Sequence, residues 1–106
     1  MSYRFMRMIV FFDLPVETAA QRREYVRFRK HLIKSGFMMM QESVYCKLLL
    51  NSTQYLSVQN GLKSNKPSAG LVQTLLVTEK QYSKMEFLVG ENKSDIINTD
   101  ERFIEL

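Results

Sequence analysis

Residues 6–14 form a nearly continuous apolar run that ends at Pro15, and this run limits the folds open to the chain. The run is short, aromatic and partly β-branched, and a breaker stops it, so a strand is favoured over a helix. A period of two places Ile9 and Phe11 on one face and the even-numbered apolar residues on the other. Because both faces are largely apolar, the sequence predicts a central strand that is covered on both sides.

Two helices are predicted after this strand. Thr18, with Gln21 three residues later, has the pattern of a capping box that begins a helix. Gly36 is a suitable residue to end this helix. The inward stripe of this first helix recurs at helical spacing and consists of Tyr25, Phe28 and Leu32. The second helix is predicted to begin at a cap formed by Asn51 or Ser52.

Further strands complete the predicted sheet. They are residues 37–48, whose polar centre holds a bulge or turn, residues 71–78, and the alternating segment 85–89. The order β-α-β-β-α-β is that of the α+β ferredoxin-like fold, in which a four-stranded antiparallel sheet carries both helices on one face. We therefore expect a ferredoxin-like domain over residues 1–93, followed by a polar C-terminal arm and an extra strand over residues 94–106.

The predicted sheet leaves one face without helices. In this fold Ile9 and Phe11 belong to that face, and an apolar open face favours association with a second copy. The extra C-terminal strand, which contains Phe103 and Ile104, can then extend the edge of a partner's sheet. We expect a homodimer in which these four residues contact the partner.

Positive charge is concentrated in the first half of the chain. The chain has fifteen Lys and Arg against eleven Asp and Glu, for a net charge of +4. A row of cations about 17 Å long follows the first predicted helix, taking a rise of ~1.5 Å per residue. A charged helix face is often only solvated surface. Because acidic partners are scarce here, we favour a surface for nucleic-acid phosphates made of Arg22, Arg23, Arg27, Lys30 and Lys34.

Several kinds of site are excluded by composition. Cys46 and His31 are the only residues of their types, so one chain cannot build an internal disulfide or a zinc site of the usual Cys/His kind. The four glycines are isolated, so there is no glycine-rich phosphate loop. No apolar run approaches the roughly 18 residues that span a bilayer. We expect a soluble cytoplasmic protein that does not bind membranes.

Three segments carry a resemblance to a known family. Residues 8–15, residues 36–37 with 41–45, and residues 75–82 together resemble the CRISPR-associated Cas-two family, and the likeness to its type II branch is greatest. This family is the small subunit of the spacer-acquisition complex. The resemblance implies a ferredoxin-like homodimer with sheets packed face to face and C-terminal strands exchanged. It also implies partnership with the larger integrase subunit, Cas-one, in capturing fragments of foreign double-stranded DNA and inserting them as new spacers.

The same resemblance gives Asp13 a candidate role. Asp13 matches the family's aspartate at the end of the first strand, and many members are described as magnesium-dependent endonucleases in which two symmetry-related aspartates flank the metal. Asp13 is therefore the candidate catalytic and magnesium-binding residue. An aspartate before Leu-Pro also often accepts backbone N–H bonds or caps the next element, so a structural role is the alternative. Glu17 is the only other acidic residue close to it in sequence, and this shortage of carboxylates argues against efficient hydrolysis.

These observations lead to two competing functions. The first is a dimeric scaffold that binds double-stranded DNA, joins the integrase and has at most weak magnesium-dependent nuclease activity. The alternative is a stand-alone metal-dependent endoribonuclease that acts through Asp13, or a toxin-like ferredoxin-fold nuclease.

Overall fold

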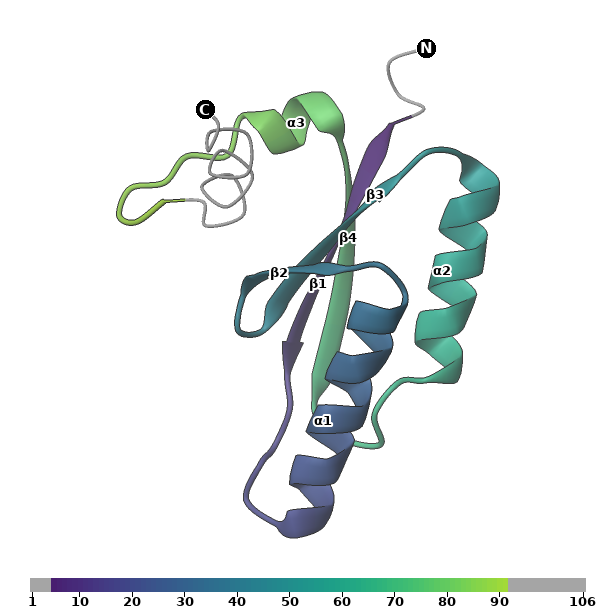
Figure 1. Cartoon of the computed structure of the whole chain (residues 1–106), viewed down its shortest axis with the longest axis vertical. Coiled ribbons are helices and arrows are strands. Elements are labelled where there is room, and N and C mark those ends of the chain that lie inside the picture. The colour runs from purple at the N-terminus through teal and green to yellow at the C-terminus, as the bar shows by residue number, and fades with distance from the viewer. Residues whose placement is uncertain (1–4, 92–106) are drawn as a thin grey trace, which may run out of the picture.

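The computed structural model of the chain describes residues 5–91 (Figure 1). It contains the strands β1 (Met6–Asp13), β2 (Met38–Gln41), β3 (Val44–Leu49) and β4 (Leu71–Thr78). Its helices are α1 (Ala19–Lys34), α2 (Ser52–Ser64) and the short α3 (Glu79–Ser83). Within residues 5–91, no helix is both long enough and apolar enough to cross a membrane.

The four strands form one antiparallel sheet in the order β2-β3-β1-β4. This order and the helices between the strands confirm the predicted α+β ferredoxin-like fold. The predicted long strand over residues 37–48 is a hairpin in which β2 and β3 are joined at the polar centre, with an irregular register between Met39 and Gln41. β1 lies between β3 and β4, as a central strand should.

Helices α1 and α2 pack on the same face of the sheet and share one core with it. Alternate residues of β1 enter this core, and Phe28 and Leu32 of α1 and Leu62 of α2 pack against them. The remaining buried members of the core are Met8, Val10, Phe12, Leu14, Phe37, Tyr45 and Leu49. The face of β1 that carries Ile9 and Phe11 therefore points away from both helices.

Local signals explain where the helices begin and where the chain turns. The Thr18 side chain accepts a hydrogen bond from the Gln21 backbone N–H, which confirms the predicted capping box, and Asn51 caps α2 in a similar way. Gly70 has a φ of +95°, and a Cβ at this position would lie 2.7 Å from the Asp13 carbonyl oxygen. Only glycine fits where the chain passes so close to the end of β1.

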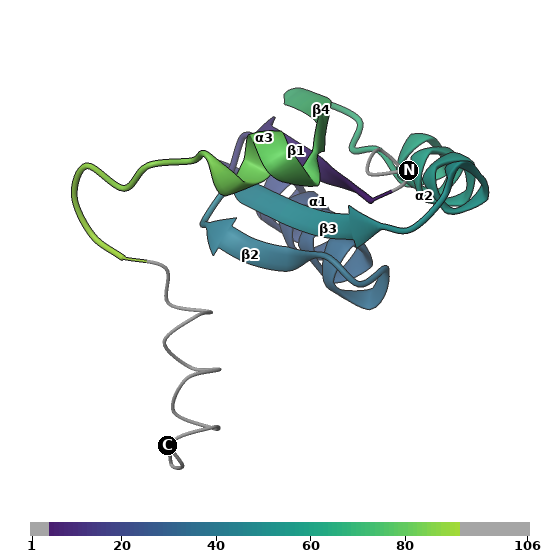
Figure 2. The same cartoon turned by 90° about the horizontal axis from the view of Figure 1, so that it is seen from above.

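The prediction of a strand over residues 85–89 is wrong. α3 ends at Ser83, and the chain after it forms no strand within residues 5–91. A strand needs a neighbour for its backbone hydrogen bonds, and this segment instead projects away from the sheet (Figure 2). Leu88 and Val89 are 91% and 92% exposed. The predicted C-terminal arm and strand, with Phe103 and Ile104, lie outside the described residues.

Candidate functional site

Asp13 is the last residue of β1 and lies on the sheet face that points away from α1 and α2. The register pairs it with Leu71 of β4, and its side chain is exposed. Among residues 5–91, no hydrogen bond or ion pair involves the Asp13 carboxylate. Its oxygens are therefore available to a cation, a water molecule or a partner, whereas the alternative role as a cap would have required a backbone N–H donor.

The donor set around Asp13 is small. Within the described part of the chain, no group of three or more His, Cys, Asp or Glu residues lies together as a metal site. Magnesium prefers oxygen ligands and keeps several of its waters, so one carboxylate with waters is a weak site and two carboxylates are a plausible one. The residues of a single chain fit a magnesium ion only if a second copy contributes another carboxylate.

The same sheet face carries exposed apolar side chains beside Asp13. Ile9 and Phe11 both lie on this face, as predicted, but they differ in exposure: Ile9 is 6% exposed and Phe11 is 37% exposed. On β4, Leu71 and Leu75 are 55% and 50% exposed. The prediction that β1 is covered on both sides therefore holds only along part of its length, and the open part is a surface on which another molecule can pack.

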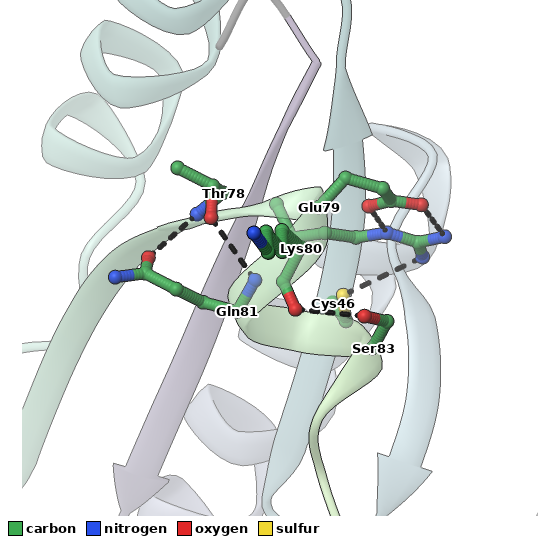
Figure 3. A network of polar contacts seen from close by, with 7 residues as sticks. Cys46, Thr78, Glu79, Lys80, Gln81 and Ser83 are labelled. Carbon is green, nitrogen blue, oxygen red and sulfur yellow. Dashed lines mark hydrogen bonds and ion pairs between the residues drawn. The ribbon is translucent and has the colours of Figure 1, made fainter. Parts of the chain in front are cut away.

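A polar network that the sequence analysis missed lies at the other end of this face (Figure 3). Arg7 of β1 donates two hydrogen bonds to the Glu79 carboxylate of α3, with N–O distances of 2.8 and 3.0 Å. The Arg7 guanidinium also lies 4.3 Å from the centre of the Tyr82 ring and 3.9 Å from the Cys46 sulfur. No local signal reveals this network, because Arg7 and Glu79 are 72 residues apart.

The network perturbs the ionisation of its members in opposite senses. The hydrogen bonds from Arg7 lower the pKa of Glu79, and the same bonds raise the pKa of Arg7 above its usual value. Burial raises the pKa of the Cys46 thiol, against the opposing effect of Arg7. At neutral pH the site therefore holds a paired carboxylate and guanidinium above a neutral, buried thiol.

The five predicted phosphate-binding cations all lie exposed on α1, but they are not equivalent. The Arg22 Nη1 donates to the Val16 and Glu17 carbonyl oxygens, at 3.1 and 3.0 Å. The Arg27 fork binds the Glu24 carboxylate, with N–O distances of 2.9 and 3.1 Å. This pair lowers the pKa of Glu24 and raises that of Arg27. Two of the five cations are therefore already engaged within the chain.

The other three cations make no such contacts. Arg23, Lys30 and Lys34 form no hydrogen bond or ion pair with any residue from 5 to 91. On a helix these positions lie within about 40° of one another, so their side chains form one row. A shallow groove runs along the same side of α1 and is lined by Ala19, Arg22, Arg23, Val26, Arg27 and Lys30. Of the five predicted cations, the three that are available to an anionic ligand lie in this row.

Comparison with known proteins gives a consistent result. The family model described as CRISPR associated protein Cas2 matches residues 6–85. A protein named CRISPR-associated endoribonuclease Cas2 from Treponema denticola is 57% identical over 101 residues, which cover 95% of this chain and all of that protein. Proteins of the same name from Ligilactobacillus salivarius and Streptococcus mutans UA159 are each 46% identical over 95% of this chain and 100% and 93% of their own lengths. A solved structure described as the crystal structure of Cas2 superposes with a TM-score of 0.61 at 24% identity, over 85% of this chain and 92% of that one.

Proposed function

The chain belongs to the CRISPR-associated Cas2 family, and from this membership we propose that it acts as a homodimeric scaffold for double-stranded DNA in spacer acquisition. In this role it joins the Cas-one integrase, and together they capture and integrate new spacers. The closer likeness to the type II branch stays a prediction. The observation that carries the proposal is the separation of two surfaces: an exposed apolar sheet face on one side and a row of available cations on the other.

The apolar surface supports the dimer. Phe11, Leu71 and Leu75 lie side by side across β1 and β4, and each is more than one-third exposed. Packing two such faces about a twofold axis removes the same patch from water on both copies, which is the isologous arrangement common in homodimers. The α1 helices then lie on the two outer layers, because α1 packs on the opposite face of each sheet.

This layered arrangement restricts how DNA can bind. With layers spaced by about 10 Å, the axes of the two α1 helices are about 30 Å apart. A duplex can touch both cation rows only if it crosses the layers, and it then spans about nine base pairs between them at ~3.4 Å per base pair. Contacts of this kind go to phosphates and do not read the sequence, as capture of arbitrary foreign fragments requires.

A second candidate is a metal-dependent endoribonuclease that acts through Asp13. It is favoured by the names of the relatives and by the exposed, unpaired carboxylate of Asp13. If two copies pack through their open faces, Asp13 of each copy can hold one magnesium ion. Such an ion neutralises charge that develops on a phosphodiester and lowers the pKa of a bound water. Asp13 would hold and orient the ion, while the row on α1 would bind the phosphates of the RNA.

One experiment separates the two functions. The integrase partner and this protein are given a DNA fragment and a repeat-bearing plasmid, and integration by wild type is compared with Asp13→Asn and with Glu17→Gln as a matched control. Both variants must first sediment as dimers. Asparagine keeps the shape of aspartate but is a poor magnesium ligand, so the scaffold predicts integration within about twofold of wild type for both variants.

The opposite result would assign the mechanism to Asp13. Loss of integration by Asp13→Asn alone, with the dimer intact, would reject the non-catalytic scaffold. In parallel, RNA and DNA cleavage is measured with and without magnesium. Magnesium-dependent cleavage that Asp13→Asn abolishes and Glu17→Gln retains would establish the nuclease.

A further inference from the structure

The sheet face that lacks α1 and α2 has a covered half and an open half. Although no core helix packs there, Ile9 is buried and Cys46, its partner across the β1–β3 register, is only 3% exposed. Two residues further along β1, Phe11 is exposed, and so are Leu71 and Leu75 on β4. Something other than α1 and α2 must therefore shield one half of the face.

That shield is α3. Its five residues follow β4 directly, at a capping box formed by Thr78 and Gln81, and Figure 1 shows the helix lying across the end of the sheet. Its Tyr82 ring stacks on Arg7 and its side chain also interacts with the Cys46 thiol. These contacts place α3 over Arg7 and Cys46, which is the register partner of Ile9.

Burial of its own side chains contributes little to holding α3 in place. None of its residues is buried, and an isolated helix of this length is far below the length at which helices are stable in water. The Glu79 backbone N–H donates to the Phe5 carbonyl oxygen, at 3.2 Å. Beyond this bond and its direct continuity with β4, α3 is tied to the sheet by the stacked Tyr82 ring and by the paired hydrogen bond between Arg7 and Glu79. Forked, charge-assisted bonds of this kind are directional as well as strong, so they fix both the position and the orientation of α3.

We propose that the Arg7–Glu79 pair is a positioning device for dimer assembly. By holding α3 over the β1–β3 side of the face, at Arg7 and Cys46, it leaves Phe11 and the β4 residues Leu71 and Leu75 for a second copy, although Leu75 is the register partner of Ile9. This inference rests on the proposed dimer and adds to it the location of the interface. Because Asp13 lies at the same open end of β1, the device also directs Asp13 of both copies into the shared interface.

The attachment of α3 can be measured through the thiol that it covers. Cys46 is the only cysteine, so a maleimide modifies this site alone, and opening of α3 raises the rate of its modification. Glu79→Gln keeps the size of the side chain but loses the ion pair, and Glu86→Gln is the matched control at an exposed acidic residue. Since the pair is partly exposed, we expect labelling about fivefold faster in Glu79→Gln and unchanged in Glu86→Gln.

The location of the interface is measured by cross-linking. Gln73 is exposed on the open half, beside Phe11 in the register. Gln73→Cys is placed in a Cys46→Ser background and treated with a flexible bis-maleimide, with and without Glu79→Gln. We expect the cross-linked dimer to form with the intact pair and its yield to fall about threefold or more when Glu79 is changed, while sedimentation still shows folded protein. Restoring the ion pair in reverse, by Arg7→Glu with Glu79→Arg, should recover the yield.

The outcomes are distinct. Faster labelling of Cys46 without any change in cross-linking would show that α3 opens but does not position the dimer, and would overturn the inference. Unchanged labelling would overturn it as well, because the pair would not hold α3. A dimer that forms without cross-linking at Gln73 would place the interface elsewhere. A wild-type protein that remains monomeric at all concentrations would remove the proposed function itself and this inference with it.

Discussion

Four cations line one groove on α1, and two of them have no partner within the described residues. Two double variants, one for the cations without partners and one for the engaged cations, test which cations bind DNA. Arg23 and Lys30 are unengaged, and Arg23→Gln with Lys30→Gln removes two charges from the groove. Each phosphate contact contributes about −0.9 to the slope of log affinity against log salt for B-form DNA. Both copies of the dimer carry the two changes, and the duplex touches both rows, so four contacts are lost. The slope should therefore fall by about 3.6, which at about 0.1 M salt corresponds to a roughly 4000-fold weaker affinity.

The control removes the same charge from the same groove. Arg22→Gln with Arg27→Gln replaces the two guanidinium groups that already bind the loop carbonyls and Glu24. Binding of a labelled duplex is followed by fluorescence anisotropy from about 0.05 to 0.3 M salt, after circular dichroism shows that both variants are folded. We expect the slope of the control to change by less than about 0.9, the value of one contact. Equal changes in the two variants would mean that only the total charge matters, and no change in either would remove α1 from the DNA surface.

Three further predictions concern stability. Phe28→Ala should lower the free energy of unfolding by about 3–5 kcal/mol in a urea titration, because Phe28 is fully buried in the core and its loss leaves a cavity. Gly61→Ala should raise it by about 0.5–1 kcal/mol, since Gly61 lies within α2 and an added Cβ would be at an ordinary 3.7 Å from the His31 ring. Burial, with the charges of Arg27 and Lys34, lowers the pKa of His31 below its usual 6.5. The folded state thus binds this proton less readily than the unfolded state, so stability should fall as the pH drops below about 6.5, and His31→Gln should flatten urea midpoints measured between about pH 5 and pH 8.

The parts of the fold that depend on local signals could be predicted from the sequence. The capping box at Thr18 and the apolar stripe of α1 each depend on residues within one or two turns, and the structure has them where expected. The order of the elements then favours one fold. The segment 85–89 shows where such reasoning fails: alternation predicts two faces for a strand but does not supply the neighbour to which its backbone must bond.

The candidate site could be predicted only in part, for a similar reason. Helical spacing correctly placed the five cations along the exposed surface of α1, because spacing decides which face a residue occupies. It could not show that Arg22 turns back to the loop before α1, or that the Arg27 fork is held by Glu24. Availability to a ligand depends on these competing contacts, and the number of available cations, not the number of cations, sets the salt dependence of binding.

The open sheet face depends still more on contacts between distant residues. Period two in β1 places Arg7, Ile9, Phe11 and Asp13 on one face, but it treats all four positions alike. In the structure the four positions differ in exposure, because Glu79, 72 residues after Arg7, binds Arg7 and holds α3 over it. If α3 were released, Ile9 and Cys46 would join Phe11 in a longer apolar surface, and two copies could pack in more than one register. The Arg7–Glu79 ion pair thus sets where the apolar surface ends on β1. The carboxylate of Asp13 lies at the opposite end of β1, where a second copy can reach it.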